Sequence, residues 1–277
     1  MNEHQQALET MRETPGYSEF YEFGCRLAAL AKQKKENGYD AILIPNLFVE
    51  TPVGFSPKEF IHLLSELVYD LRLKTPVGEE TYIIEVYKDD ESSLKSLVNK
   101  LHQAAGFYGE FNGFVGLQIE TEADIHQLKY LFQLVETQPK MTFVFFVSNT
   151  SDERARKKLE IELMRRVNLH QMKIDGLNPE QMTEYLEARL DVKGYSITAE
   201  ARESLQAALR ELKKSSCFGG YKTLNQLVDH IIWNLIDSTS SHRTISTRDL
   251  SFLFERRGFL DSFQEQNTRC IGFGEKG

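Results

Sequence analysis

The segment 51–58, which reads TPVGFSPK, has the position and length of a phosphate-binding loop but lacks its residues. It follows an apolar run rich in β-forming residues (41–49) and precedes leucine and isoleucine at helical spacing (57–73). In the pattern G-x-x-x-x-G-K-[ST], glycines let backbone N–H groups converge on phosphates, and the lysine reaches the terminal ones. The segment keeps one glycine, Gly54, at a position that the pattern leaves open. The four fixed positions hold Thr51, Ser56, Pro57 and Lys58.

These replacements remove the chemistry of phosphoryl transfer. Pro57 deletes both the cation and a backbone donor, and Lys58 can replace the lysine only if the register shifts. The metal-anchoring aspartate expected after the third strand is also missing, because 114–120 reads FVGLQIE and keeps only Glu120. Phosphoryl transfer depends on a metal and cations around the γ-phosphate, so we expect no hydrolysis and no bound cofactor.

The length, net charge and cysteine content of the chain argue against several classes of protein. The chain has 277 residues and a formal charge of −8, which disfavours nucleic acid as a partner, since phosphates demand a basic face. Its cysteines (Cys25, Cys217 and Cys270) form no C-x-x-C pair and its histidines are dispersed, so we expect no metal site and no disulfide framework. We expect a cytoplasmic protein, because no signal peptide or membrane span is apparent.

Strand and helix patterns alternate along the first part of the chain and give way to helices alone. Strands are predicted at 41–49, 81–87, 114–119, 141–147 and 169–174. Helices are predicted at 19–35, 57–73, 89–101, 122–136 and 151–167, and then at 179–192, 198–214, 221–237 and 246–256. This order predicts a parallel five-stranded α/β domain flanked by helices, followed by a small all-helical domain. The expected divisions are a polar N-terminal segment (1–14), the α/β domain (15–176), the helical domain (177–263) and a loosely ordered tail (264–277).

Five short motifs resemble those of AAA+ ATPases in order and spacing, most closely the rubisco-activase and sporulation-associated type, over residues 15–255. They are FVSN (146–149), ELMRR (162–166), LNPEQM (177–182), YSITAEA (195–201) and FGGYKT (218–223). The resemblance implies a P-loop-type domain with a helical lid. It also implies sensor roles for Asn149 and Lys222, and an arginine finger at Arg165 or Arg166.

An aromatic loop at 106–113 lies where this family often carries pore aromatics, and it supplies the candidate partner-binding residues Phe107, Tyr108 and Phe111. The alternative is a loop that packs on its own core.

Each other motif residue also has a plainer interpretation. Asn149 is a residue type that caps helices or ends strands. Arg165 and Arg166 lie in a helix with opposite charges at i, i+4 spacing, which is typical of a solvated face. Lys222 fits an ordinary helix start, and we expect Trp233 in the core of the helical domain.

These observations together predict a catalytically inactive AAA+-like protein with a structural or regulatory role. Its expected partner is an active AAA+ ATPase or further copies of itself, without a membrane. One alternative is an active NTPase with a remodelled phosphate loop. Another is a nucleic-acid-handling subunit resembling the inactive members of clamp loaders, which the acidity disfavours.

Overall fold

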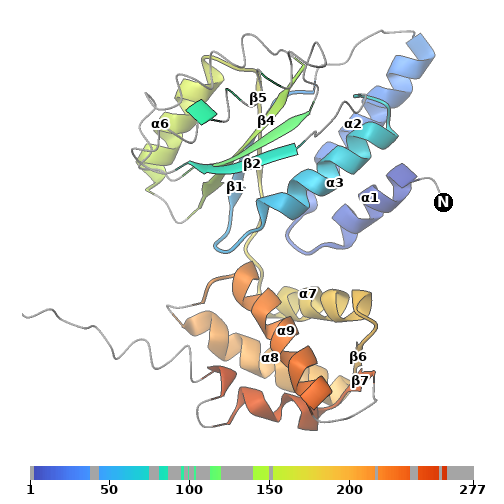
Figure 1. Ribbon diagram of the computed structural model, residues 1–277, viewed down its shortest axis with the longest axis vertical. Coiled ribbons are helices and arrows are strands. Elements are labelled where there is room, and N and C mark those ends of the chain that lie inside the picture. Colours follow the sequence, from blue (N-terminus) through green and yellow to red (C-terminus); the bar gives the residue numbers. More distant parts are fainter. Residues whose placement is uncertain are drawn as a thin grey trace, which may run out of the picture. The chain divides into compact units, whose positions relative to one another are not determined.

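The chain divides into two compact units, Met1–Asp175 and Gly176–Gly277 (Figure 1). The computed structural model describes residues 3–37, 44–74, 81–86, 95, 96, 99, 103, 113–119, 140–149, 152–215, 218–237, 243–255 and 258–260. Most of the predicted helix 89–101, all of the predicted helix 122–136, Glu120 and the three aromatic-loop residues lie outside these ranges.

The first unit is built on a parallel sheet of five strands in the order β2-β3-β4-β1-β5. The strands are β1 (Asn46–Thr51), β2 (Thr81–Val86), β3 (Phe114–Ile119), β4 (Thr142–Ser148) and β5 (Leu169–Lys173). β4 lies in the middle of the sheet and its side chains from Thr142 to Val147 are all buried. A continuous apolar run is the pattern expected of a strand covered on both faces. The predicted parallel α/β arrangement is therefore confirmed.

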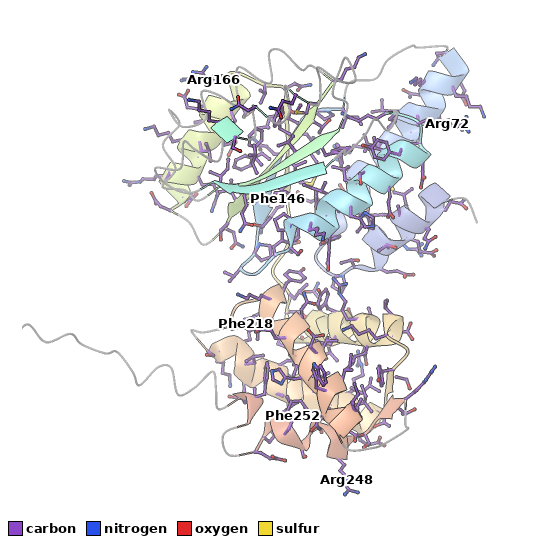
Figure 2. All side chains as sticks on the ribbon, viewed as in Figure 1. Arg72, Phe146, Arg166, Phe218, Arg248 and Phe252 are labelled. Carbon is purple, nitrogen blue, oxygen red and sulfur yellow. The ribbon has the colours of Figure 1, made fainter. Side chains whose placement is uncertain are left out.

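Helices cover both faces of this sheet (Figure 1). α1 (Glu3–Glu13), α2 (Ser18–Asn37) and α3 (Pro57–Asp70) lie on one face, and α6 (Glu153–Met164) lies on the other. The core under α1 to α3 includes Val144 and Phe146 of β4, and Figure 2 shows Phe146 between the sheet and α3. Residues that alternate along the strand thus face opposite layers.

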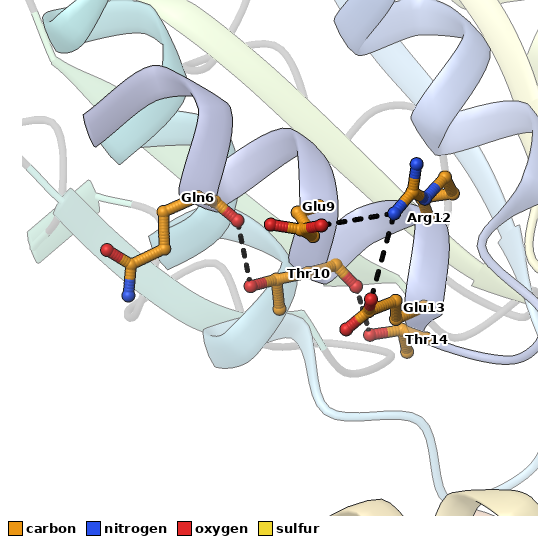
Figure 3. A network of polar contacts seen from close by, with 6 residues as sticks. All are labelled: Gln6, Glu9, Thr10, Arg12, Glu13 and Thr14. Atoms are coloured by element: carbon orange, nitrogen blue, oxygen red, sulfur yellow. Dashed lines mark hydrogen bonds and ion pairs between the residues drawn. The ribbon is translucent and has the colours of Figure 1, made fainter. Parts of the chain in front are cut away.

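The N-terminal segment was predicted to lie outside the α/β domain, and the structure corrects this. It forms α1, which packs against α3 and buries Ala7 and Met11 in the shared core. Gly24 of α2 permits the close approach, because a Cβ there would lie 2.9 Å from Leu8 Cδ2. The exposed side of α1 carries a polar network in which Arg12 pairs with Glu9 at 3.1 Å (Figure 3). Exposed pairs contribute little, so burial holds this helix in place.

α2 also protects the edge of the sheet at β5. The Lys173 backbone N–H donates to Glu19 Oε2 at 2.7 Å, and the Asp175 N–H donates to the Gly16 carbonyl at 3.1 Å. Edge strands with open N–H groups invite unwanted pairing, and the Glu19 contact occupies one such group of β5. The second bond ties the segment after β5 to the segment before α2. Phe23 stacks on His170 of the same strand, and burial lowers the pKa of that imidazole, with Arg26 acting in the same direction.

α3 ends three residues earlier than predicted, in a turn that buries a lysine. Arg72 has a left-handed backbone (φ 55°), its N–H donates to Tyr69 O, and the Leu73 N–H donates to Val68 O. These two bonds define a Schellman motif, which ends a helix and is most often built with glycine. Figure 2 marks Arg72 beside the end of α3.

We expect Arg72→Gly to stabilise the protein by about 0.5–1 kcal/mol, because glycine adopts this backbone conformation without steric cost. Urea unfolding followed by circular dichroism measures the change. The exposed Arg26→Gly, placed inside α2, is the control and should destabilise by about 1 kcal/mol. A loss of stability in Arg72→Gly would contradict the strain at this turn.

The turn at Arg72 places Lys74 inside the first unit. This side chain is 8% exposed, and its Nζ donates to the Lys140 carbonyl and to Gly113 O at 3.5 Å. Nζ also lies 5.1 Å from the centre of the Phe114 ring. Burial lowers the pKa of Lys74 to about 7, because the charged ammonium loses its hydration.

The second unit contains α7 (Pro179–Val192), α8 (Ala199–Lys214), α9 (Tyr221–Asp237) and the 3-10 helix η2 (Thr247–Leu253). Asn178 and Gln181 form a capping box that begins α7. The prediction of an all-helical domain is wrong in one respect. β6 (Ser196–Ile197) and β7 (Thr244–Ile245) form a small parallel pair, each too short to give an alternating sequence pattern.

The core of the second unit is apolar and draws on all of its helices. Phe218, in the segment before α9, and Phe252, within η2, pack against it (Figure 2). The predicted core position of Trp233 is wrong, because this side chain is 64% exposed. At 100° per residue it lies about 200° around α9 from the buried Ile231, on the outer face.

Candidate functional site

The sheet order identifies one crevice as the candidate site. The connection after β1 runs through α3 to β2 on one side of the sheet, and the connection after β4 runs through α6 to β5 on the other. β1 and β4 are neighbours, so the chain diverges to opposite faces at their carboxyl ends. Open α/β sheets bind ligands at such a switch point. We call this region the carboxyl-end site.

The segment 51–58 lies at this site but forms a closed turn. Thr51 is still part of β1, where it pairs with Ser148 and its carbonyl accepts the Asn149 N–H at 2.8 Å. The Phe55 N–H donates to the Pro52 carbonyl at 3.3 Å, and Gly54 between them has φ 72°. A positive φ at the third residue is the mark of a type II turn. The Phe55 N–H thus closes the turn and does not point to a ligand.

Phe55 packs its ring into the aromatic core beneath the turn. Its ring centre lies 5.9 Å from that of Phe146, 6.1 Å from that of Phe60 and 6.3 Å from that of Tyr17. Phe146 comes from β4 and Phe60 from α3, so these rings join the strand and helix that flank the crevice. A phosphate placed against apolar rings would lose hydration without gaining polar partners.

The N-terminus of α3 is also poorly suited to an anion. Ser56 holds the N-cap position but makes no side-chain capping bond, and Pro57 has no N–H. Glu59 in the first turn already complements the positive end of the helix dipole. Lys58 is exposed. The described residues therefore do not fit a magnesium-bound triphosphate.

A polar link that the sequence did not reveal spans the other side of the site. Arg156 Nε of α6 lies 3.4 Å from Glu50 Oε1 of β1, and the two side chains are 15% and 29% exposed. The Arg156 guanidinium also donates to the Asn149 carbonyl at 3.2 Å. No motif joins these residues in the sequence.

Asn149 belongs to this link only through its backbone carbonyl, and the structure places the other predicted site residues apart from the link or outside the residues that it describes. Asn149 follows β4 at the site, but it does not cap α6, because Asp152 accepts the N–H groups of Arg154 and Ala155. Arg165 ends α6 and pairs with Glu162 at 2.9 Å. Figure 2 shows Arg166 at the outer end of the same helix. Lys222 is exposed on α9 of the second unit. The residues that lie outside the description are Glu120, Phe107, Tyr108 and Phe111.

Within the described part of the chain, no three His, Cys, Asp or Glu side chains gather closely enough to hold a metal ion. None of the described helices has both the length and the apolar content that a membrane crossing requires.

Comparisons with known proteins identify no family for this chain. No family model matches, and no curated protein matches. Among solved structures, a point mutant of RuvB from Thermotoga maritima is 13% identical, with 84% of this chain and 68% of that chain covered at a TM-score of 0.48. A second RuvB mutant is 11% identical, with 83% and 67% covered at a TM-score of 0.47. RIF2 from Saccharomyces cerevisiae is 14% identical, with 94% and 92% covered at a TM-score of 0.41. At such values the function has to be argued from the residues of this chain.

We expect Gly54→Ala to destabilise the first unit by about 1–2 kcal/mol, because a Cβ is strained at this left-handed position. Val53→Ala in the same turn, with Val53 41% exposed, should change stability by no more than about 0.5 kcal/mol. Chemical unfolding of both variants measures the difference. Equal stabilities would mean that the turn does not hold Gly54 in this conformation.

Proposed function

We propose that this chain is a catalytically inactive AAA+-like subunit with a structural or regulatory role. Its partner would be an active AAA+ ATPase or further copies of this chain. The observation that carries the proposal is the closed turn at 52–55, in which Phe55 packs against Phe60 and Phe146 at the switch point of the sheet. Nucleotide chemistry needs open backbone donors and a cation there.

The retained frame supports a role in assembly. The chain retains the parallel sheet, the turn after β1 and the motifs that resemble the AAA+ family. The Glu50–Arg156 pair connects β1 to α6 at the position where the family would hold a ligand. In this proposal the unit Gly176–Gly277 is the counterpart of the family's helical lid. In this proposal Arg165 and Arg166 contact the partner, because an arginine finger acts on a neighbouring site and does not need its owner to bind ATP. The aromatic-loop residues are further candidates for the same contact.

The test starts with the chain at its native level in native cells. Light scattering after size-exclusion chromatography measures its assembly, and mass spectrometry identifies the associated proteins. We expect an associated ATPase whose hydrolysis rate changes when the purified chain is added, while the chain alone hydrolyses nothing. A strict monomer with no effect on any associated ATPase would contradict the proposal.

A pair of variants separates a specific contact from a general effect. Arg165→Ala/Arg166→Ala should weaken the change in the partner's hydrolysis rate. The control Arg248→Ala, an exposed arginine of the second unit, should leave it intact (Figure 2). Equal effects of both variants would remove the arginine pair from the proposed interface.

A further inference from the structure

The outer face of α6 carries a set of basic and apolar side chains that the carboxyl-end site does not use. At 3.6 residues per turn, the six positions from Arg154 to Arg165 that carry these side chains fall within an arc of about 120° and span about 16 Å of the helix. The buried side chains of α6, Leu159 and Leu163, lie on the opposite side. We call this set the α6 stripe, and its members are Arg154, Lys157, Lys158, Ile161, Met164 and Arg165.

The charge of the stripe is opposite to that of the chain as a whole. The chain carries a formal charge of −8, yet four of the six stripe residues are cationic and all six are exposed. Among the residues that the structure describes, no carboxylate lies within ion-pair distance of Arg154, Lys157 or Lys158. Unpaired cations on a low-dielectric surface attract an acidic partner and repel a basic one.

The stripe also contains two apolar side chains at i, i+3 spacing. Ile161 is 44% exposed and Met164 is 51% exposed. Met164 Sδ accepts a hydrogen bond from Gln171 Nε2 at 3.4 Å, which places this side chain against β5. A phosphate backbone would need the cations alone, whereas apolar side chains surrounded by charges are typical of protein interfaces. The composition therefore favours a protein over nucleic acid.

We propose that the α6 stripe is a docking surface for an acidic segment of a partner protein. The segment places carboxylates against Arg154, Lys157 and Lys158, and one or two apolar side chains against Ile161 and Met164. Its length matches about three helical turns, the span of the stripe. This inference rests on the proposed function only in requiring a protein partner, and it does not depend on an inactive nucleotide site.

Selection from a displayed library of random 15-residue peptides on the purified full chain tests the stripe. We expect the enriched peptides to combine net negative charge with apolar residues, and rising salt to weaken their binding. Lys157→Glu/Lys158→Glu and Ile161→Ser/Met164→Ser should each weaken it by about tenfold or more. The control Lys32→Glu/Lys35→Glu makes the same charge change on exposed positions of α2 and should leave binding intact. Circular dichroism of each variant confirms that it folds.

Three results would overturn the docking surface. One is a selection without acidic enrichment. Another is equal binding of the selected peptides to the stripe variants and to the control. The third is tighter binding of a duplex DNA through the same residues, which would show a nucleic-acid surface. Nucleotide binding is measured separately and tests the proposed function. The docking surface and the inactive nucleotide site can therefore be contradicted independently of each other.

Discussion

Phe60→Ala is expected to lower the free energy of unfolding of the first unit by about 3–5 kcal/mol. Phe60 is fully buried in α3, and its ring stacks on Phe20 with centres 3.9 Å apart. It also meets the edge of Phe146 at 5.5 Å and supports Phe55 at 6.1 Å. Removing this ring opens a cavity under the turn and loses several aromatic contacts at once.

Urea unfolding followed by circular dichroism measures the loss, with Phe254→Ala as the control. Phe254 is 56% exposed, so its truncation should change stability by no more than about 0.5 kcal/mol. A cost below about 1 kcal/mol for Phe60→Ala would mean that the aromatic cluster does not hold α3 to the sheet.

Stability is also expected to rise with pH above neutrality because of Lys74. Its pKa is about 7 in the folded chain, lowered by burial, against 10.5 when unperturbed. Between these values the unfolded chain binds a proton that the folded chain has released, so raising the pH favours folding. The expected slope is about 1.4 kcal/mol per pH unit, and it disappears below pH 7, where both states are protonated.

Lys74→Met isolates this contribution. Unfolding at several pH values between 6.5 and 9.5 should show that the wild type gains stability with pH relative to the variant. The difference cancels the titration of tyrosines and cysteines that both proteins share. Lys173→Met, with Lys173 side chain 50% exposed, is the control and should follow the wild-type profile. Parallel profiles for Lys74→Met and the wild type would show that Lys74 keeps its ordinary pKa when folded.

Sequence patterns predicted the helix and strand bounds best where buried apolar residues recur at a regular spacing along the chain. β3 has the predicted bounds, and α3 begins at Pro57 because proline suits the first turn of a helix. The end of α3 was missed because Arg72 takes a backbone conformation that the sequence signals only when glycine is present. β1 also extends to Thr51, two residues beyond its predicted end, so the turn begins later than expected.

The contacts between distant residues were beyond the sequence patterns. α1 was taken as a separate polar segment because, among its described side chains, only Ala7 and Met11 are buried, and Leu8 packs against the core while partly exposed. The Glu50–Arg156 pair joins a strand to a helix far along the chain, and only the sheet order brings them together. Trp233 was misplaced for a different reason. Its apolar character outweighed its position on the helix, although the spacing of Leu224, Val228 and Ile231 already defined the buried face.

The sequence alone showed that residues of the phosphate-binding pattern are missing, but it did not predict the conformation that the segment 51–58 adopts. The pattern showed that Pro57 replaces the lysine. Only the structure shows that Phe55 turns inward onto Phe146 and that the turn uses its own N–H. The packing of Phe55 makes the site unsuited to phosphate even if a cation were restored, because the aromatic ring would remain.

Titration of the full chain with a fluorescent ATP analogue and Mg²⁺ is the most direct test of whether the carboxyl-end site has lost nucleotide binding. We expect no saturable binding up to about 1 mM, and no difference between the wild type and Lys58→Ala. Saturable, magnesium-dependent binding in the micromolar range that Lys58→Ala abolishes, while circular dichroism shows a folded protein, would contradict this expectation.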